Sequence, residues 1–220
     1  MTEPKEITFH AGAVSLNGYG ILLPGPKYSG KSVMTLGMLL KGCEFLGEDV
    51  ATVDHASLEV IPYTHPNIYV RQSALTLFPE LTNRGWTRMR HDSDGDPFEQ
   101  AAYTTVHRIG TRVSLRCPVN LVVFPTYDRQ ATGVTFAPLA PGIAVLQLLE
   151  SCVDLGADVD QGLDVVIALL NNAHTFTLRY DDVRKACDRV VEVARAIRPT
   201  ARVPSKQVES MRLEFAGGYR

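Results

Sequence analysis

The sequence predicts an α/β protein in which a mixed sheet carries a phosphate-binding loop and helices flank the sheet. The apolar segment Gly20–Leu23 is typical of a buried strand, and the helix formers of Val33–Lys41 stop at Gly42. Between them lies a run that fits G-x-x-x-x-G-K-[ST], in the strand–loop–helix context that this motif requires. The run consists of Gly25, Pro26, Lys27, Tyr28, Ser29, Gly30, Lys31 and Ser32.

This motif predicts that the chain binds a nucleotide. Backbone N–H groups of the loop, at the positive end of the following helix, would turn inward around a β-phosphate. Lys31 would reach the β- and γ-phosphate oxygens, and the Ser32 hydroxyl would ligate Mg²⁺. Together with Val33, which follows directly, the run is the expected nucleotide-binding segment. The alternative is a chance glycine turn before a helix.

Composition and charge narrow the class of protein. With 220 residues, of which 45% are hydrophobic, the chain is long and apolar enough for one domain with a real core. A net charge of −2 gives no reason to expect nucleic acid as a partner. The four cysteines are scattered without a Cys-x-x-Cys pair, which favours reduced thiols over a zinc site. With no signal peptide and no apolar run of membrane length, we expect a cytoplasmic protein without a membrane partner.

The segment before the loop is expected to be an N-terminal β-meander. Glu6–His10 and Ala13–Leu16 have the pattern of short strands, and Asn17-Gly18 is a tight-turn signal. Meander geometry would bring His10, at the end of the first strand, back towards the phosphate loop. A purely structural role for this lone histidine is the alternative.

Two carboxylates follow the helix behind the loop. The short strand Glu44–Leu46 is followed, after Gly47, by Glu48 and Asp49. Carboxylates at a strand end beside a phosphate loop suit either Mg²⁺ binding or the acceptance of a substrate proton. A solvated turn is the alternative.

The middle of the chain is expected to continue with strands. Ala51–Asp54 and Leu58–Pro62 are typical of a hairpin, and Asn67–Val70 of a further strand that ends at Arg71. Arg71 is either a phosphate or substrate clamp or a surface charge. Ser73–Phe78 has the pattern of a short helix with Ser73 as its N-cap.

The polar, arginine-rich segment 85–116 is interpreted as an insertion or mobile lid, whose arginines could meet an acidic substrate or ATP phosphates. A solvated loop is the alternative. Its acidic patch, Asp92–Asp96, does not fit a calcium loop, because the glycine comes too early and Pro97 follows.

The second half of the chain is expected to complete the sheet and its helices. Val119–Phe124 is continuously apolar, which indicates a strand buried on both faces. No acid follows it directly and no guanine-reading Asn-Lys-x-Asp motif is present, so a Ras-like GTPase is not expected. The metal-side acid is therefore sought at Glu48 and Asp49. The later elements expected are a strand at Thr132–Pro138, helices at Ile143–Cys152 and Leu163–Asn172, a strand at Thr175–Arg179 and a last helix at Val183–Ile197.

With these features, the chain resembles the catalytic domain of HPr kinase/phosphorylase and the stand-alone HPr-kinase-like serine kinases, whose core is related to phosphoenolpyruvate carboxykinase. His10 falls where the family has a functional histidine. The resemblance covers most of the chain, but its specific motifs lie between residues 10 and 50. The similar segments are Asn17–Gly25, Leu39–Gly42 and Phe45–Val50, together with Leu121–Tyr127 and Thr177–Asp182, which are similar to uncharacterised relatives.

The resemblance implies one kinase domain over residues 1–198, followed by a polar tail over 199–220. It implies transfer of the γ-phosphate of ATP, with Mg²⁺, to a serine hydroxyl of a peptide or small protein such as a natural-product precursor peptide. In this interpretation Glu48 accepts the substrate proton, His10 orients groups near the transferred phosphate, and Ser32, Asp49 and Glu48 are the candidate Mg²⁺ ligands. The relatives assemble as homo-oligomers. The alternative functions are a kinase for free serine or another metabolite, and a nucleotide-binding regulatory protein without transferase activity.

The chain also departs from the family. Glu48 stands where the family usually has aspartate, which leaves the role of base open between Glu48 and Asp49. The loop interior lacks the family's additional glycine. Val70–Ser73 occupies the place of the family's glycine-rich phosphorylase signature, so we expect kinase activity without the reverse phosphorylase reaction.

Overall fold

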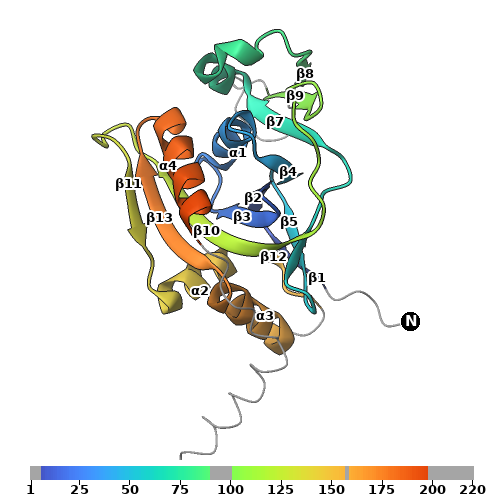
Figure 1. Cartoon of the computed structure of the whole chain (residues 1–220), viewed down its shortest axis with the longest axis vertical. Helices are drawn as coiled ribbons and strands as arrows, with labels where there is room; N and C mark the ends of the chain where they lie inside the picture. The colour runs from blue at the N-terminus through green and yellow to red at the C-terminus, as the bar shows by residue number, and fades with distance from the viewer. Residues whose placement is uncertain (1–5, 90–100, 157–158, 198–220) are drawn as a thin grey trace, which may run out of the picture.

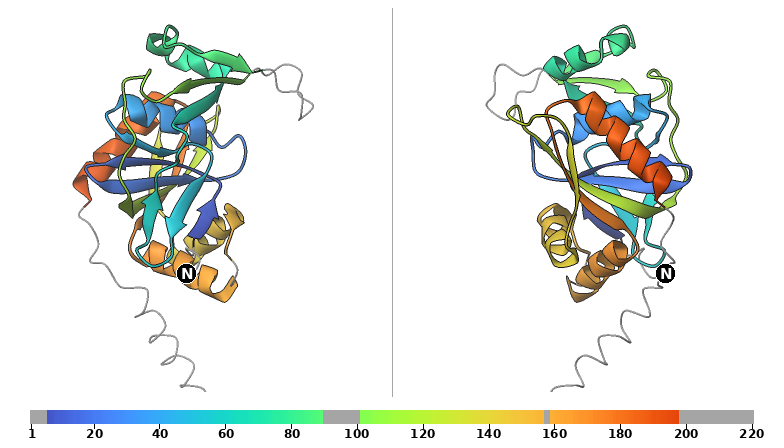
Figure 2. Two further views of the ribbon diagram at one scale, coloured as in Figure 1. Left: turned by 90° about the vertical axis from the view of Figure 1, so that its right-hand side faces the viewer. Right: turned by 60° about the vertical axis from the view of Figure 1, so that its left-hand side comes forward.

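The computed structural model describes residues 6–89, 101–156 and 159–197. They form three layers, in which helices cover both faces of a large mixed sheet (Figure 1). Helices α1 (Lys31–Leu40) and α4 (Val183–Ala196) lie side by side on one face, and α2 (Pro141–Glu150) and α3 (Val159–Asn171) on the other. Figure 2 shows the same two helix pairs from two further sides. The sequence therefore predicted the α/β class correctly.

The main sheet positions the predicted phosphate-binding loop, residues 25–32. Its ten described strands run in the order β12-β1-β5-β6-β10-β3-β2-β4, with β13 beside β10 and β11 beside β13. Strand β10 is parallel to both β3 and β13, so the carboxyl ends of these three strands meet at one edge of the sheet, where the loop begins. The strands are β1 (Glu6–Phe9), β2 (Ala11–Leu16), β3 (Tyr19–Pro24), β4 (Glu44–Gly47), β5 (Ala51–Asp54), β6 (Glu59–Ile61), β10 (Cys117–Tyr127), β11 (Thr135–Pro138), β12 (Cys152–Asp154) and β13 (His174–Tyr180).

Two hydrophobic cores hold the layers together. On β10, Leu121 and Val123 pack into the core that contains α1 and α4, whereas Val122 and Phe124 pack into the core that contains α2 and α3. A strand with a core on each face has no solvent side, which explains why its sequence is continuously apolar.

Helix α1 ends where the sequence predicts. Gly42, just beyond the helix, has φ +91°, and its N–H donates to the carbonyl of Leu39. Left-handed backbone at this position favours glycine, which ends the helix and turns the chain into β4. Leu36 and Leu39 are buried on the face of α1 that packs into the first core.

A second, three-stranded sheet lies above the main one, in the order β7-β9-β8. Its strands are β7 (Asn67–Arg71), β8 (Thr87–Met89) and β9 (Ala101–Thr105), and two 3₁₀ helices, η1 (Gln72–Leu77) and η2 (Pro79–Leu81), follow β7. Strands β8 and β9 belong to the segment 85–116, for which no strand was predicted from the sequence. The acidic patch at residues 92–96 lies outside the described residues.

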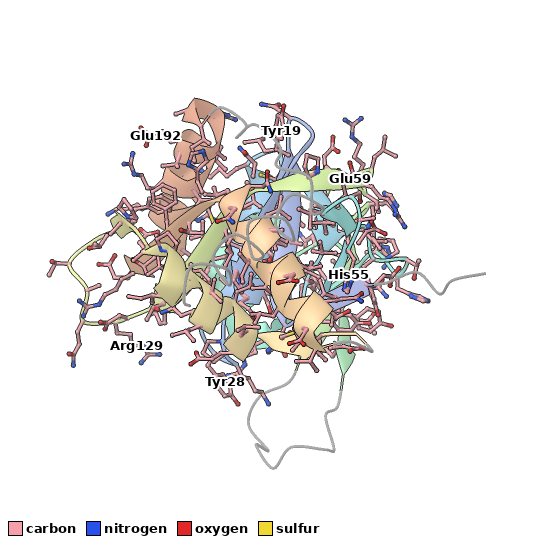
Figure 3. All side chains as sticks on the ribbon, turned by 90° about the horizontal axis from the view of Figure 1, so that it is seen from below. Tyr19, Tyr28, His55, Glu59, Arg129 and Glu192 are labelled. Carbon is pink, nitrogen blue, oxygen red and sulfur yellow. The ribbon has the colours of Figure 1, made fainter. Side chains whose placement is uncertain are left out.

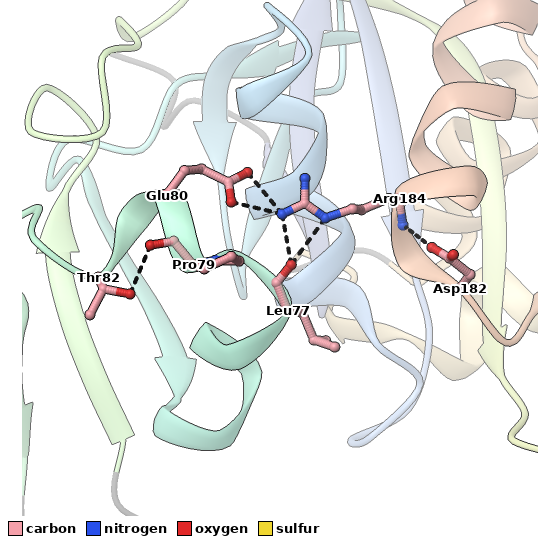
Figure 4. A network of polar contacts seen from close by, with 6 residues as sticks. All are labelled: Leu77, Pro79, Glu80, Thr82, Asp182 and Arg184. Carbon is pink, nitrogen blue, oxygen red and sulfur yellow. Dashed lines mark hydrogen bonds and ion pairs between the residues drawn. The ribbon is translucent and has the colours of Figure 1, made fainter.

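An arginine ties the 3₁₀ helices to α4. Arg184 donates to the carbonyl of Leu77 through Nε (3.1 Å) and Nη2 (2.8 Å), and Nη2 also contacts the Glu80 carboxylate at 2.7 Å (Figure 4). Asp182 caps the first turn of α4 by accepting from the backbone N–H groups of Arg184 and Lys185. The segment Ser73–Phe78, for which the sequence predicts a short helix capped by Ser73, lies instead largely in the 3₁₀ helix η1. The residue before η1 is Arg71, and no side chain caps η1.

The N-terminal β-meander is corrected by the strand pairing. Strands β2 and β3 form the expected hairpin, but β1 pairs with β5 and β12 instead of β2. Only His10 separates β1 from β2, and one residue is too short for a hairpin connection.

The segment Cys152–Asp154, where the sequence predicted a helix end, is the edge strand β12. The predicted tail, residues 199–220, lies outside the described ranges, within which no helix is long and apolar enough to cross a membrane.

Candidate active site

The predicted phosphate-binding loop connects β3 to α1 through a run of unusual backbone conformations. Gly30 precedes α1 with φ +96°, and Tyr28 has φ +73°. Lys31, the first residue of α1, is buried and donates from Nζ to the carbonyl of Pro26 at 2.8 Å. Burial lowers the pKa of Lys31, while the nearby Asp49 and Glu48 act in the opposite direction. The lysine is therefore folded back over the loop, with two carboxylates close enough to act on its charge.

The start of α1 has the features of an anion site. No side chain caps this helix, and no acidic residue lies in its first turn. The hydroxyl of Ser29 is buried and has no hydrogen-bond partner among the described residues. Uncapped N–H groups at the positive end of a helix, together with an unsatisfied hydroxyl, fit the oxygens of a phosphate group.

Tyr180 contacts the loop and was not singled out as a site residue by the sequence. A Cβ at Gly30 would lie 2.1 Å from the hydroxyl of Tyr180, so this tyrosine closes the space above Gly30. The ring of Tyr180 is buried at the end of β13 and lies 5.7 Å, between centroids, from that of Tyr127 at the end of β10. No spacing signal in the sequence links Tyr180 to a loop about 150 residues earlier.

The two predicted carboxylates lie in different environments. Glu48 is 6% exposed and lies in the same pocket as Ser32 and Tyr69. Burial raises the pKa of Glu48 to about 7, while the hydroxyl of Ser32 acts in the opposite direction. The carboxylate is therefore close to the hydroxyl that the motif assigns to Mg²⁺.

Asp49 pairs with His10. The distance from His10 Nε2 to Asp49 Oδ1 is 2.7 Å, and the exposed fractions of the two side chains are 34% and 65%. The backbone N–H of His10 donates to the carbonyl of Ser151 at 2.6 Å, which fixes the residue between β1 and β2. His10 therefore reaches the acidic pair, although through a strand arrangement other than the predicted meander.

One pocket brings these groups together. It has a volume of about 1250 Å³ and is lined by the loop, the acidic pair, His10, the end of β7 and the start of α4. Tyr28, exposed at the periphery (Figure 3), contacts two cations: the guanidinium carbon of Arg71 is 4.1 Å from the ring centroid, and Lys27 Nζ is 5.5 Å from it. Of the sequence-predicted site residues, the pocket lining includes His10, Lys27, Tyr28, Gly30, Lys31, Ser32, Val33, Glu48, Asp49 and Arg71.

The residues present fit Mg²⁺ bound together with phosphates. No group of three or more His, Cys, Asp and Glu side chains in the described ranges forms a metal site by itself. Mg²⁺ usually takes one or two carboxylates, with substrate phosphate oxygens and waters as its remaining ligands. The Ser32 hydroxyl, Glu48 and the adjoining Asp49 supply such a partial set beside the helix N-terminus.

Comparisons with known proteins found similarity among solved structures. No family model matches the chain, and no curated protein matches it. Among solved structures, the chain is similar to the HPr(Ser) kinase/phosphatase from Coxiella burnetii, over 86% of this chain and 99% of that chain. The sequence identity is 10% and the TM-score 0.38, and a likeness at this level carries no functional assignment.

Proposed function

We propose that the chain is an ATP- and Mg²⁺-dependent kinase that transfers the γ-phosphate to a serine hydroxyl of a peptide or small protein. The observation that carries the proposal is the position of the buried Glu48 in one pocket with Lys31 and Ser32 of the motif. Enzymes with this loop hold Mg²⁺ between the loop Ser or Thr and a further acidic side chain. Glu48 comes directly after β4, which only β2 separates from β3 in the sheet, and can supply that acid.

The environments of the two carboxylates favour different roles. Glu48 is buried and close enough to the Ser32 hydroxyl for that group to act on its pKa, which favours the metal side of the site. Asp49 is exposed in the pocket and paired with His10, which favours contact with an acceptor hydroxyl. We therefore propose Asp49 as the base, oriented by His10. The resemblance had implied the reverse assignment, with Glu48 as the base.

The proposed reaction is a single displacement at phosphorus. The acceptor hydroxyl oxygen forms a bond to the γ-phosphorus, and the bond from that phosphorus to the β–γ bridging oxygen breaks, which releases ADP. The acceptor proton goes to the Asp49 carboxylate. Lys31 and the N–H groups at the start of α1 bind the phosphate oxygens, and bound Mg²⁺ would neutralise part of their charge.

The size of the pocket favours a large acceptor. Pockets for a single small molecule are usually about 300–1,000 Å³, and this one is about 1250 Å³ and open. It has room for a nucleotide and part of a peptide. Free serine or another metabolite as the acceptor, and nucleotide binding without transfer, are the outcomes that an experiment must separate from peptide phosphorylation.

The test is transfer of label from γ-labelled ATP in the presence of Mg²⁺, with serine-containing peptide pools, free serine and water as acceptors. Wild type, Lys31→Ala, Asp49→Asn and Glu48→Gln are compared. We expect label on a peptide serine, with Lys31→Ala and Asp49→Asn each at least ~10²-fold slower. Asp49→Asn should lower kcat with little change in nucleotide affinity, whereas Glu48→Gln should raise the Mg²⁺ concentration needed for half-maximal rate.

Other results would reassign the function. Label on free serine alone would make the chain a metabolite kinase. Nucleotide binding without label on any acceptor would favour a regulatory protein. If Lys31→Ala binds ATP as wild type does, the loop does not hold the phosphates and the proposal fails.

A further inference from the structure

Tyr28 combines a strained backbone with an arginine stacked on its ring. We propose that the Tyr28 side chain is a positioning residue, which holds the guanidinium of Arg71 over the phosphate loop so that Arg71 binds the terminal phosphate of ATP. This inference rests on the proposed nucleotide site, and it adds a contact that would distinguish ATP from ADP. Arg71 enters from β7, while Tyr28 belongs to the loop itself.

The strained backbone of Tyr28 indicates that its side chain has a functional role. Its φ of +73° lies in the left-handed region, which a bulky residue rarely occupies and which glycine adopts without strain. The ring is not needed for core packing, because the residue is 64% exposed. Strained residues that are held in place cluster at functional sites, so the cost in backbone conformation points to a role for the ring.

The geometry of the stack suits phosphate binding. The guanidinium carbon of Arg71 lies 4.1 Å from the Tyr28 ring centroid, within the range of a cation–π contact. Stacking uses the face of a guanidinium, whereas phosphate oxygens bind its N–H edge, so one arginine can do both. A planar arginine held in this way loses less freedom when it binds its ligand.

The charges around the stack agree with an anionic ligand. Lys27 Nζ is 5.5 Å from the same ring, and Lys31 lies in the same pocket. Three cations thus line the pocket at the loop, together with the carboxylates of Glu48 and Asp49. Beyond a β-phosphate, a γ-phosphate adds further negative charge at such a site, so Arg71 should contribute more to ATP than to ADP binding.

The experiment measures affinity and needs no acceptor. Binding of a non-hydrolysable ATP analogue and of ADP, both with Mg²⁺, is measured by calorimetry for wild type, Tyr28→Asn, Tyr28→Phe and Arg71→Gln. Asparagine tolerates left-handed backbone but offers no ring, and phenylalanine keeps the ring without the hydroxyl. Arg116→Gln, which removes one positive charge outside the pocket, is the electrostatic control.

We expect Tyr28→Asn and Arg71→Gln each to weaken the ATP analogue about tenfold, and ADP by less than about twofold. Tyr28→Phe and Arg116→Gln should bind as wild type does. The double variant Tyr28→Asn/Arg71→Gln should be no weaker than Arg71→Gln alone, because the ring acts through the arginine.

The inference is overturned if Tyr28→Asn leaves the ratio of the two affinities unchanged, or if its effect adds fully to that of Arg71→Gln. Thermal unfolding of each variant identifies one that is misfolded, and for a misfolded Tyr28→Asn the comparison moves to Tyr28→Gly. Failure of the nucleotide site has a different signature, since wild type would then bind neither nucleotide, and failure of phosphate transfer alone would leave both affinities measurable.

Discussion

At the residue scale, the loop requires a residue without a side chain at position 30. Gly30 has left-handed backbone and also lies under the hydroxyl of Tyr180, so two separate constraints act on one position. Tyr28 has a similar backbone but open surroundings, and it keeps a large side chain. Backbone conformation alone therefore does not require glycine in this loop, whereas the approach of Tyr180 does.

The two constraints on Gly30 can be measured separately. We expect Gly30→Ala to lower the free energy of unfolding by about 1–3 kcal/mol more than Gly42→Ala, because only the former meets another atom. Gly42 has nearly the same φ, and no atom would lie within 4 Å of a Cβ there. Urea unfolding gives both values. The explanation is wrong if the two variants are equally stable, or if adding Tyr180→Phe restores nothing to Gly30→Ala.

The burial of Glu48 links stability to pH in the metal-free protein. Its pKa is about 7 in the folded chain and near the ordinary 4.5 when unfolded, so between these values only the folded chain binds the proton. Below pH 4.5, the raised pKa of Glu48 stabilises the folded chain by about 3 kcal/mol. This stabilisation is lost as the pH rises through 7. Urea unfolding in a chelator at pH 5 and pH 8 should show this fall in wild type.

Glu48→Gln should remove that part of the pH dependence, whatever its effect on stability at any one pH. Glu150→Gln, which removes an exposed carboxylate from α2, is the matched control and should keep the wild-type slope. An equal fall in wild type and Glu48→Gln would mean that another group causes it.

At the scale of elements, the candidate site lies beside helix α4 and the 3₁₀ helix η1, which Arg184 connects. Helix α4 and η1 both contribute residues to the pocket lining, and Figure 4 shows the contacts between them. Arg184 joins them through the Leu77 carbonyl and Glu80. Because both charged side chains are about half exposed, water screens the pair and its energy is small. We therefore expect the Arg184–Glu80 pair to act mainly on the local opening of the two 3₁₀ helices.

We expect Arg184→Ala to speed amide hydrogen exchange in residues 72–81, while lowering global stability by no more than about 1 kcal/mol. Exchange elsewhere, for example in α3, should be unchanged. Arg189→Ala removes a surface pair with Glu192 within α4 and serves as the control. Unchanged exchange in residues 72–81 would show that the 3₁₀ helices are held by packing alone.

Element by element, the sequence predicted best where the signal was local. The strand, loop and helix at residues 20–42 follow from apolar spacing and glycines, and the carboxylates follow from their place after β4. The pairing of β1, the short strands β8, β9 and β12, and the contact of Tyr180 with Gly30 depend on partners far away in the chain. The left-handed backbone of Tyr28 could not be predicted from the sequence either, because the motif accepts any residue at this position.

At the scale of the whole molecule, burial should make the thiols report on global unfolding. All four cysteines are free, and burial raises the pKa of Cys43, Cys117 and Cys187 to about 12. Cys152 is only partly buried. Thiolate is the reactive form, so at neutral pH we expect one fast-reacting thiol and three slow ones.

Labelling with a thiol reagent, followed by mass spectrometry, would identify the fast cysteine as Cys152. Labelling of the other three should occur together and slow down when Mg²⁺ and ATP are added, since ligand binding stabilises the folded state. Rapid modification of Cys43 or Cys187 in the native protein would contradict the packing of α1 against α4. Cys152→Ser, which should leave only slow labelling, is the control.

The contact between Gly30 and Tyr180 also has a consequence for how the protein is made. The loop leaves the ribosome early, but the tyrosine that covers it is added about 150 residues later, or roughly 8–30 s at ordinary rates of synthesis. Strand β13, which carries Tyr180, pairs in parallel with β10 and cannot form before most of the chain exists. A nascent chain stalled before residue 174 would therefore carry the complete motif without the tyrosine that covers it.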